Sequence, residues 1–245
     1  MIVRKISIAL LLGLCLSVYA SASCSNATLV GNYGFTITGV NGSGSLTAAV
    51  GQLTADGKGN FTGIETQSTL GVISSDVALT GTYSVNANCT GTGTITSGQT
   101  ANISLVVVTN GAQFEITRTD AGTSQYGYAL AQRKAICTNA GIKGTFGFRG
   151  GGFNSSLQPS AYAGQVKLNG LGGLTGSESA SFNGSIQSFS LSGSYSVSSN
   201  CTGTATFNGG AGNVAHTYFV IVNGGQSAMQ IQTDANIIDT IFVQK

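Results

Sequence analysis

The sequence repeats itself after about 113 residues, and this repeat restricts the chain to two copies of one fold. Residues 24–35 read CSNATLVGNYGF and residues 137–148 read CTNAGIKGTFGF, so that the cysteine, two glycines and the final phenylalanine coincide. Residues 79–91 match residues 191–203 in the same way, including a shared Tyr-Ser-Val and Asn-Cys-Thr-Gly. A period of this length is that of a domain, because solenoid units repeat after only roughly 20 to 50 residues. We therefore predict two tandem domains.

The first 22 residues have the form of a signal peptide. Arg4 and Lys5 precede an uncharged run of 15 residues, 6–20, and residues 20–22 read Ala-Ser-Ala, a small-x-small cleavage sequence. The run is shorter than the roughly 20 residues that span a bilayer as a helix, and no later apolar stretch is longer. We predict cleavage near Ala22, export to the periplasm or the medium of a bacterium, and no transmembrane helix.

The mature chain is expected to be neutral. Removing Arg4 and Lys5 leaves eight basic side chains against eight acidic ones, so nucleic-acid binding lacks its electrostatic driving force. Charged residues make up only 7% of the sequence, whereas glycine supplies 37 positions and Ser and Thr are abundant. Hydroxyl groups are therefore expected to cover much of the surface.

Cys15 lies in the predicted signal peptide, and the other four cysteines divide evenly between the copies. The predicted domains, 23–136 and 137–245, then hold one pair each, with nearly the same spacing within the pair. Four cysteines allow three pairings, and pairing within each domain is favoured because a duplicated domain should carry its own disulfide. The isolated cysteines lack the ligand spacing of a zinc site. The predicted disulfides are Cys24 with Cys89 and Cys137 with Cys201.

Apolar and polar residues alternate along many segments of both copies, for example at 33–37 and 77–85. This period of two is typical of half-buried strands. Turn sequences such as Asp-Gly at 56–57 and Asn-Gly at 110–111 separate the strands, as in hairpins. We predict an all-β fold of two tandem antiparallel barrels, up-and-down and calycin-like, with about eight strands each. A β-sandwich is the alternative.

No catalytic, metal or cofactor site emerges from the motifs. Residues 56–60 have some of the spacing of a calcium loop, but the second copy at 169–173 lacks the carboxylate, so we predict a hairpin at both places. His216 is the only imidazole in the two domains, which disfavours a hydrolytic triad. Asp120 and Asp234 follow strands and precede small residues, and we expect them to cap turns.

Both copies retain a carboxylate at one position, as Glu65 and Glu178, although charge is scarce in this chain. Glu65 shares a strand face with Phe61 and Gly63, so an inward orientation would leave a buried charge in need of a partner. Arg118 has the strand parity to pair with it. We predict Glu65, Arg118 and Glu178 as ligand-binding residues. The alternative is that the carboxylates lie at strand ends and face water.

The stretches at 51–63 and 79–91 resemble uncharacterised secreted, Gly/Thr/Ser-rich tandem β-repeat proteins of soil bacteria. This resemblance covers both copies, and it implies neither an activity nor catalytic residues. The lipocalin and avidin families are similar in strand number alone, and the absence of Trp removes the residue that usually closes the floor of their barrels.

We expect a non-enzymatic binding or surface protein, whose barrels hold a small apolar ligand or whose hydroxyl-rich exterior contacts a polysaccharide. One alternative is a barrel-type cyclase or isomerase with Glu65 and Glu178 as acid and base. The other is a structural envelope protein or an outer-membrane barrel. A large lumen lined by Glu65 or Glu178 would favour a ligand or a substrate, and a lumen filled by aromatic side chains would favour a scaffold.

Overall fold

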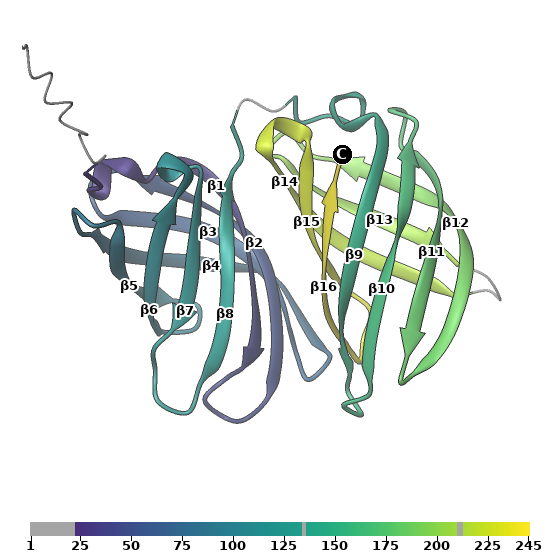
Figure 1. Ribbon diagram of the computed structural model, residues 1–245, viewed down its shortest axis with the longest axis horizontal. Helices are drawn as coiled ribbons and strands as arrows, with labels where there is room; N and C mark the ends of the chain where they lie inside the picture. Colours follow the sequence, from purple (N-terminus) through teal and green to yellow (C-terminus); the bar gives the residue numbers. More distant parts are fainter. Residues whose placement is uncertain (1–22, 134–135, 210–212) are drawn as a thin grey trace, which may run out of the picture.

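The chain forms two closed antiparallel β-barrels that lie side by side (Figure 1). The computed structural model describes residues 23–133, 136–209 and 213–245. In each barrel every strand pairs with its neighbours in sequence, and the last strand pairs with the first. The prediction of two up-and-down barrels of eight strands is confirmed, and the sandwich alternative is wrong. The predicted signal peptide lies outside the described residues.

The strands of the first barrel are β1 (Val30–Val40), β2 (Leu46–Asp56), β3 (Asn60–Thr69), β4 (Val72–Val85), β5 (Thr90–Ser97), β6 (Ala101–Val108), β7 (Gln113–Arg118) and β8 (Ser124–Ala131). Those of the second are β9 (Gly144–Asn154), β10 (Pro159–Leu168), β11 (Gly173–Phe182), β12 (Ser185–Val197), β13 (Thr202–Asn208), β14 (Val214–Val222), β15 (Ser227–Gln232) and β16 (Ile237–Gln244). The predicted boundary between the domains falls between β8 and the next helix, in a segment of which residues 134–135 lie outside the described ranges.

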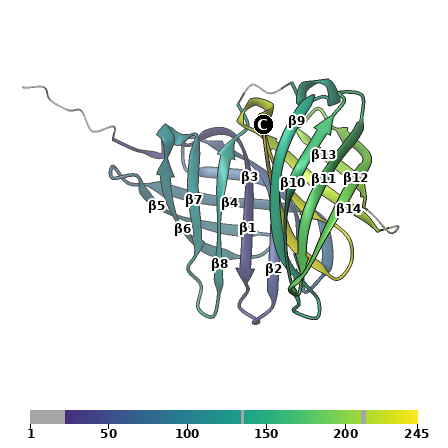
Figure 2. The same cartoon turned by 45° about the vertical axis from the view of Figure 1, so that its right-hand side comes forward.

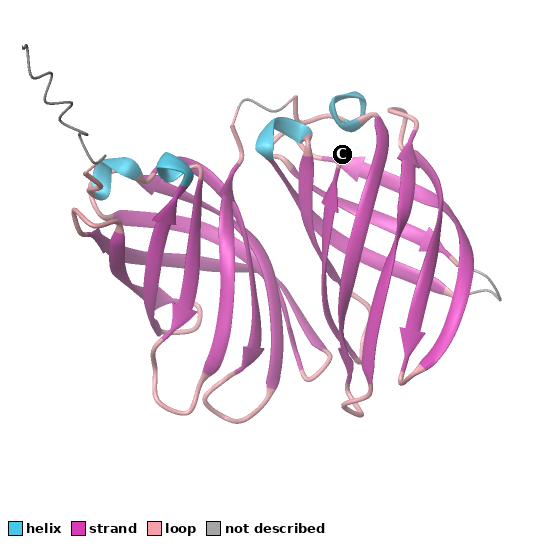
Figure 3. Cartoon of the chain, in the orientation of Figure 1, coloured by secondary structure: helices cyan, strands magenta, loops and turns pink. Residues whose placement is uncertain are grey.

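Short 3-10 helices lie at one end of both barrels, the upper end in Figure 3. They are η1 (Asn26–Thr28), η2 (Thr109–Gly111), η3 (Asn139–Ile142) and η5 (Asn223–Gly225). Within the ranges that the structure covers, no helix is long and apolar enough to cross a membrane.

Side-chain alternation along the strands places the apolar residues inside the barrels. In β4, Leu79, Tyr83 and Val85 are buried in the interior, whereas the intervening Thr80 and Thr82 are exposed. The second barrel has its own interior cluster of buried apolar residues. In an outer-membrane barrel the apolar residues face lipid, so the orientation seen here is the reverse.

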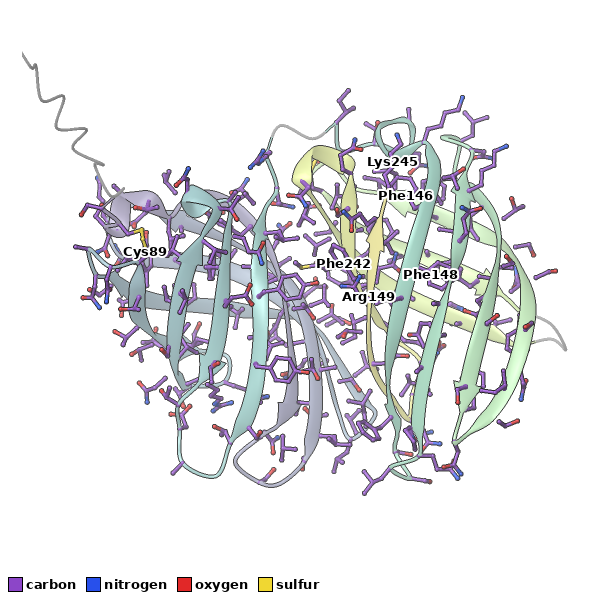
Figure 4. The ribbon with its side chains drawn as sticks, in the orientation of Figure 1. Cys89, Phe146, Phe148, Arg149, Phe242 and Lys245 are labelled. Atoms are coloured by element: carbon purple, nitrogen blue, oxygen red, sulfur yellow. A yellow bond between two sulfur atoms is a disulfide. The ribbon has the colours of Figure 1, made fainter. Side chains whose placement is uncertain are left out.

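One disulfide closes the helical end of each barrel, Cys24–Cys89 in the first and Cys137–Cys201 in the second. Each disulfide joins the residues before a 3-10 helix to the turn between the fourth and fifth strands, where Figure 4 labels Cys89. Both predicted pairings are confirmed. Two disulfides indicate that the chain folds in an oxidising compartment.

The hairpin between the second and third strands of each barrel is closed by one side-chain oxygen. The carboxylate of Asp56 accepts hydrogen bonds from the backbone N–H groups two and four residues later, at 2.7 and 2.9 Å. The amide oxygen of Asn169 accepts the same two bonds, also at 2.7 and 2.9 Å. A neutral amide therefore replaces the carboxylate without loss of geometry, and the predicted hairpin at both places is confirmed.

The two barrels also lie against each other in the turned view of Figure 2. Their interface is apolar and lies between β1, β2 and β8 of the first barrel and β14, β15 and β16 of the second. Val220 and Val222 of β14 are completely buried there. Phe242 meets Tyr128 edge-on across the interface with ring centroids 6.2 Å apart, and the Arg149 guanidinium lies 5.2 Å from the same ring (Figure 4). A separated barrel would expose this apolar face to water.

Replacing Gly34 by alanine is expected to destabilise the contact between the barrels by about 1 to 3 kcal/mol, the usual effect of overpacking. A Cβ at Gly34 would lie 2.6 Å from a methyl group of Val222 and 2.8 Å from one of Val220. Gly147, the equivalent glycine of the second barrel, has only a carbonyl oxygen 3.9 Å away, so Gly147→Ala is the matched control. Urea unfolding of both variants tests this, and equal unfolding free energies would contradict it.

Candidate functional site

The second barrel is hollow. A cavity of about 590 Å³ occupies its lumen and is lined by side chains from all eight strands. Pockets for small molecules have volumes of roughly 300–1,000 Å³, so this cavity has the size of a ligand site. Asn154 and Asn183 of two hairpins also line it, and the cavity therefore reaches the end of the barrel opposite the disulfide. Much of the wall is aromatic, from Phe148, Phe189 and Phe207.

The first barrel is filled in the same region, where a cavity of only about 50 Å³ remains. Aliphatic side chains line this small space: Ile37, Leu79, Ile95, Ile103 and Ile116. The pairing register also shifts in β3 and β4, between Glu65 and Gln67 and between Thr80 and Gly81, and such bulges bend a strand locally. The lumen therefore differs between the barrels, packed in the first and open in the second.

All three predicted ligand residues line these spaces, Glu65 and Arg118 in the first barrel and Glu178 in the second. Glu65 faces the small cavity of the first barrel and is only 8% exposed, and burial raises its pKa to about 7. It does not face water, so the alternative of an exposed carboxylate at a strand end is wrong for Glu65. Glu178 is partly buried in the wall of the large cavity, and burial raises its pKa as well.

Arg118 pairs with Asp120 and not with Glu65. Its Nε donates to the Asp120 carboxylate at 2.7 Å, its Nη1 to Gln125 Oε1 at 3.0 Å and its Nη2 to the carbonyl oxygen of Thr100 at 2.9 Å. These three bonds engage the guanidinium within the first barrel. Arg118 thus stabilises the wall of that barrel and has no contact with the large cavity.

Asp120 and Asp234 join neighbouring strands, and the expectation that they cap turns is wrong. Asp120 accepts a hydrogen bond from the backbone of Asn102 at 3.0 Å, and Asp234 accepts one from the backbone of His216 at 2.8 Å. His216 Nδ1 also lies 2.7 Å from the Asp234 carboxylate. The His216 side chain is 56% exposed and follows the outward parity of its strand, so it does not enter the lumen.

Asp239 is a further candidate site residue that the sequence patterns did not reveal; it is 3% exposed and faces the large cavity. Tyr162 Oη donates to one carboxylate oxygen of Asp239 at 2.7 Å. Burial raises the pKa of Asp239 to about 6, although the Tyr162 hydrogen bond acts in the opposite direction. Burial and the neighbouring carboxylates raise the pKa of Tyr162 well above its usual value, so this hydroxyl remains the donor. The sequence does contain a signal for this residue, because Asp239 has the same strand parity as Ile237 and Ile241 in a mainly apolar strand.

Three neighbouring strands of the second barrel carry buried oxygens without a hydrogen-bond partner in the described chain. They are Thr217 Oγ1 on β14, Gln230 Oε1 on β15 and Asp239 Oδ1 on β16. All three residues line the large cavity. Buried polar atoms are nearly always hydrogen-bonded, so this row of oxygens on one wall needs a donor, which water or a bound molecule would supply.

The fold and the site define a protein of two β-barrels, one packed and one with a ligand-sized lumen. No family model and no curated protein matches the sequence. Among solved structures, kievitone hydratase from Nectria haematococca matches at 8% identity and a TM-score of 0.29, over 93% of this chain and 92% of that one. A Nitrosomonas europaea protein named as an AttH matches at 7% identity and a TM-score of 0.28, over 98% and 99%. With TM-scores this low, neither similarity indicates what this chain does.

Proposed function

We propose that this chain is a binding protein whose second barrel encloses a small, mainly apolar molecule. The difference between the lumens, about 590 Å³ against about 50 Å³, is the observation that most supports this function. An unfilled cavity destabilises a fold because the atoms that line it lose packing contacts. A bound molecule would restore those contacts. The first barrel then serves as a packed support for the wall of the binding site.

The interface between the barrels fits this division of roles. The strands that carry Thr217, Gln230 and Asp239 toward the cavity present alternate residues to the first barrel. Val220 and Ile231 lie on that opposite face and are fully buried. Packing on both faces fixes the position of these strands, so the polar wall of the site is held rigid.

Export is part of the proposal. It rests on the predicted signal peptide at residues 1–22 and on the oxidising compartment that two disulfides indicate. The resemblance to secreted tandem β-repeat proteins of soil bacteria agrees with it. A mass spectrum of the protein from its own source, with the mature N-terminus read directly, tests the cleavage near Ala22.

The binding function is tested with the neutral fluorescent probe N-phenylnaphthylamine. The wild-type protein is expected to increase its fluorescence saturably, and Thr217→Trp is expected to weaken binding about tenfold or more because the indole would occupy the cavity. His216→Trp, at the adjacent position with its side chain outside the barrel, is the matched control and should bind normally. Equal binding by both variants would place the probe outside the lumen and contradict the proposal.

A barrel-type cyclase or isomerase is the second candidate. It is supported by two carboxyl groups with raised pKa in one cavity, Glu178 and Asp239, because acid–base catalysts work best when their pKa lies near the working pH. Glu65, the other predicted acid or base, faces a space too small for a substrate. Native mass spectrometry of protein purified from its own source identifies a molecule that the protein retains. This molecule is then incubated with fresh protein. An unchanged mass of the molecule supports binding, and a changed mass supports catalysis.

A further inference from the structure

The cavity of the second barrel offers hydrogen-bond acceptors without a matching cation. Two carboxylates, Asp239 and Glu178, line it together with the unpaired oxygens of Thr217 and Gln230. Among the described residues that line it there is no lysine, arginine or histidine. A buried carboxylate is stable in its charged form only when a partner compensates the charge, and Tyr162 compensates one of the two oxygens of Asp239.

Asp239 has an equivalent in the first barrel, Gln125. The strand pairings establish this equivalence, because Asp239 lies opposite Gly152 of β9 and Gln125 lies opposite Gly39 of β1. Gly152 and Gly39 are related by the same 113-residue shift as the rest of those strands. Both side chains face the lumen of their own barrel. The two barrels can therefore be compared residue by residue at this place.

The first barrel provides its own cation to this position. Arg118 Nη1 donates to Gln125 Oε1 at 3.0 Å. In the second barrel the residue equivalent to Arg118 is Gln232, whose amide donates to Asp234 at 2.9 Å. The second barrel therefore has a carboxylate, Asp239, where the first has the neutral amide of Gln125. At the position of the Arg118 guanidinium it has the neutral Gln232.

The rest of the wall suits an organic cation with an apolar body. Phe148, Phe189 and Phe207 line the cavity. Aromatic rings attract cations through their faces and pack well against hydrocarbon. A simple metal ion would leave most of the 590 Å³ unoccupied, and an anion would meet two carboxylates.

We propose that the lumen of the second barrel selects an organic cation, a protonated amine or guanidinium on an apolar body. Its cationic head binds the unpaired oxygen of Asp239, in the place that the Arg118 guanidinium holds beside Gln125 in the first barrel. Thr217 and Gln230 accept further hydrogen bonds from the same head, and the aromatic wall holds the apolar body. This inference rests on the proposed binding function and adds the charge of the ligand to it.

The test compares octylamine, octanol and octanoate, which share one hydrocarbon chain and differ in the charge of the head group. Isothermal titration calorimetry at neutral pH should show octylamine binding about tenfold or more tightly than octanol, because hydrogen bonds to a buried charge are stronger than neutral ones. Octanoate should bind most weakly. Thr217→Trp should remove octylamine binding and so place it in the lumen.

Asp239→Asn should abolish the preference for octylamine over octanol, because a neutral amide no longer favours a cationic head group. Asp56→Asn is the matched control, since it removes the same charge from the first barrel at a hairpin where the second barrel already has Asn169. This control should retain the full preference. Circular dichroism of both variants shows that they fold.

Each result decides a different claim. If octanol binds in the lumen as tightly as octylamine, or if Asp239→Asn keeps the preference, the inference of a cationic ligand is overturned while the binding function stands. If neither octylamine nor octanol binds in a manner sensitive to Thr217→Trp, and N-phenylnaphthylamine also fails to bind, the binding function itself is overturned.

Discussion

Replacing Cys24 and Cys89 by alanine is expected to lower the free energy of unfolding of the first barrel by about 4 kcal/mol. The disulfide joins residues that are 65 apart in the sequence. In the chain-entropy model a cross-link over a loop of that length removes about this much conformational entropy from the unfolded chain. Single domains are stable by only about 5 to 15 kcal/mol, so the loss would be a large part of the total.

Hydrogen exchange measured by mass spectrometry can read the two barrels separately. In the double variant, β1 to β8 should lose protection more than β9 to β16, with some loss in β14 to β16 because their outer face packs on the first barrel. The double variant Cys137→Ala/Cys201→Ala is the matched control, with a separation of 64 residues, and it should reverse the pattern. Unchanged urea unfolding in both variants would show that the disulfides contribute nothing to stability.

Glu65→Gln is expected to stabilise the protein above pH 7 by up to about 3 kcal/mol. Burial raises the pKa of Glu65 from 4.5 to about 7, and a difference of one in pKa between the folded and unfolded states corresponds to roughly 1.4 kcal/mol. The folded protein therefore holds this proton more tightly than the unfolded chain does. Stability falls as the pH rises from about 4.5 to about 7, and above that the full cost of the buried charge remains.

The measurement is urea unfolding between pH 4 and pH 8. Wild-type and Glu65→Gln should be similar near pH 4, where Glu65 is protonated, and should diverge as the pH approaches 8. Glu115→Gln, which removes a carboxylate from the exposed face of β7, is the control for the change in net charge. A constant difference between wild-type and Glu65→Gln at all pH values would show that Glu65 does not titrate in this range.

The architecture was predictable because the signals for it are local or repeated. The alternation in β4, with buried Leu79, Tyr83 and Val85, depends only on neighbours in sequence. The disulfide pairing followed from the repeat, since equivalent domains form equivalent bonds. The continuous apolar run at 218–222 contains a further signal, because a strand that is apolar on both faces is covered on both faces. In the structure one face of β14 lines a lumen and the other contacts the first barrel.

The candidate site was predictable only in part. Glu178 was a candidate ligand residue because it is the counterpart of Glu65 in the repeat, but its position in the wall of a large lumen comes from the structure. Asp239 was missed because its counterpart in the first barrel is the uncharged Gln125. A search for charges that both copies share therefore does not find it. Arg118 donates hydrogen bonds to Asp120 and Gln125 and not to Glu65. Strand parity shows which side of a strand a residue faces, but it does not show which polar group lies within hydrogen-bond distance.

The sequence by itself determined two all-β domains, their hairpins and their disulfides, since alternation, turn residues and a repeated pair of cysteines act over short distances or recur. Only the tertiary structure decided that the first barrel is filled and the second is hollow, and that Asp239 meets Tyr162 in that space. The volume of a closed barrel depends on how eight strands tilt, bend and fill it together, and no single strand carries that information.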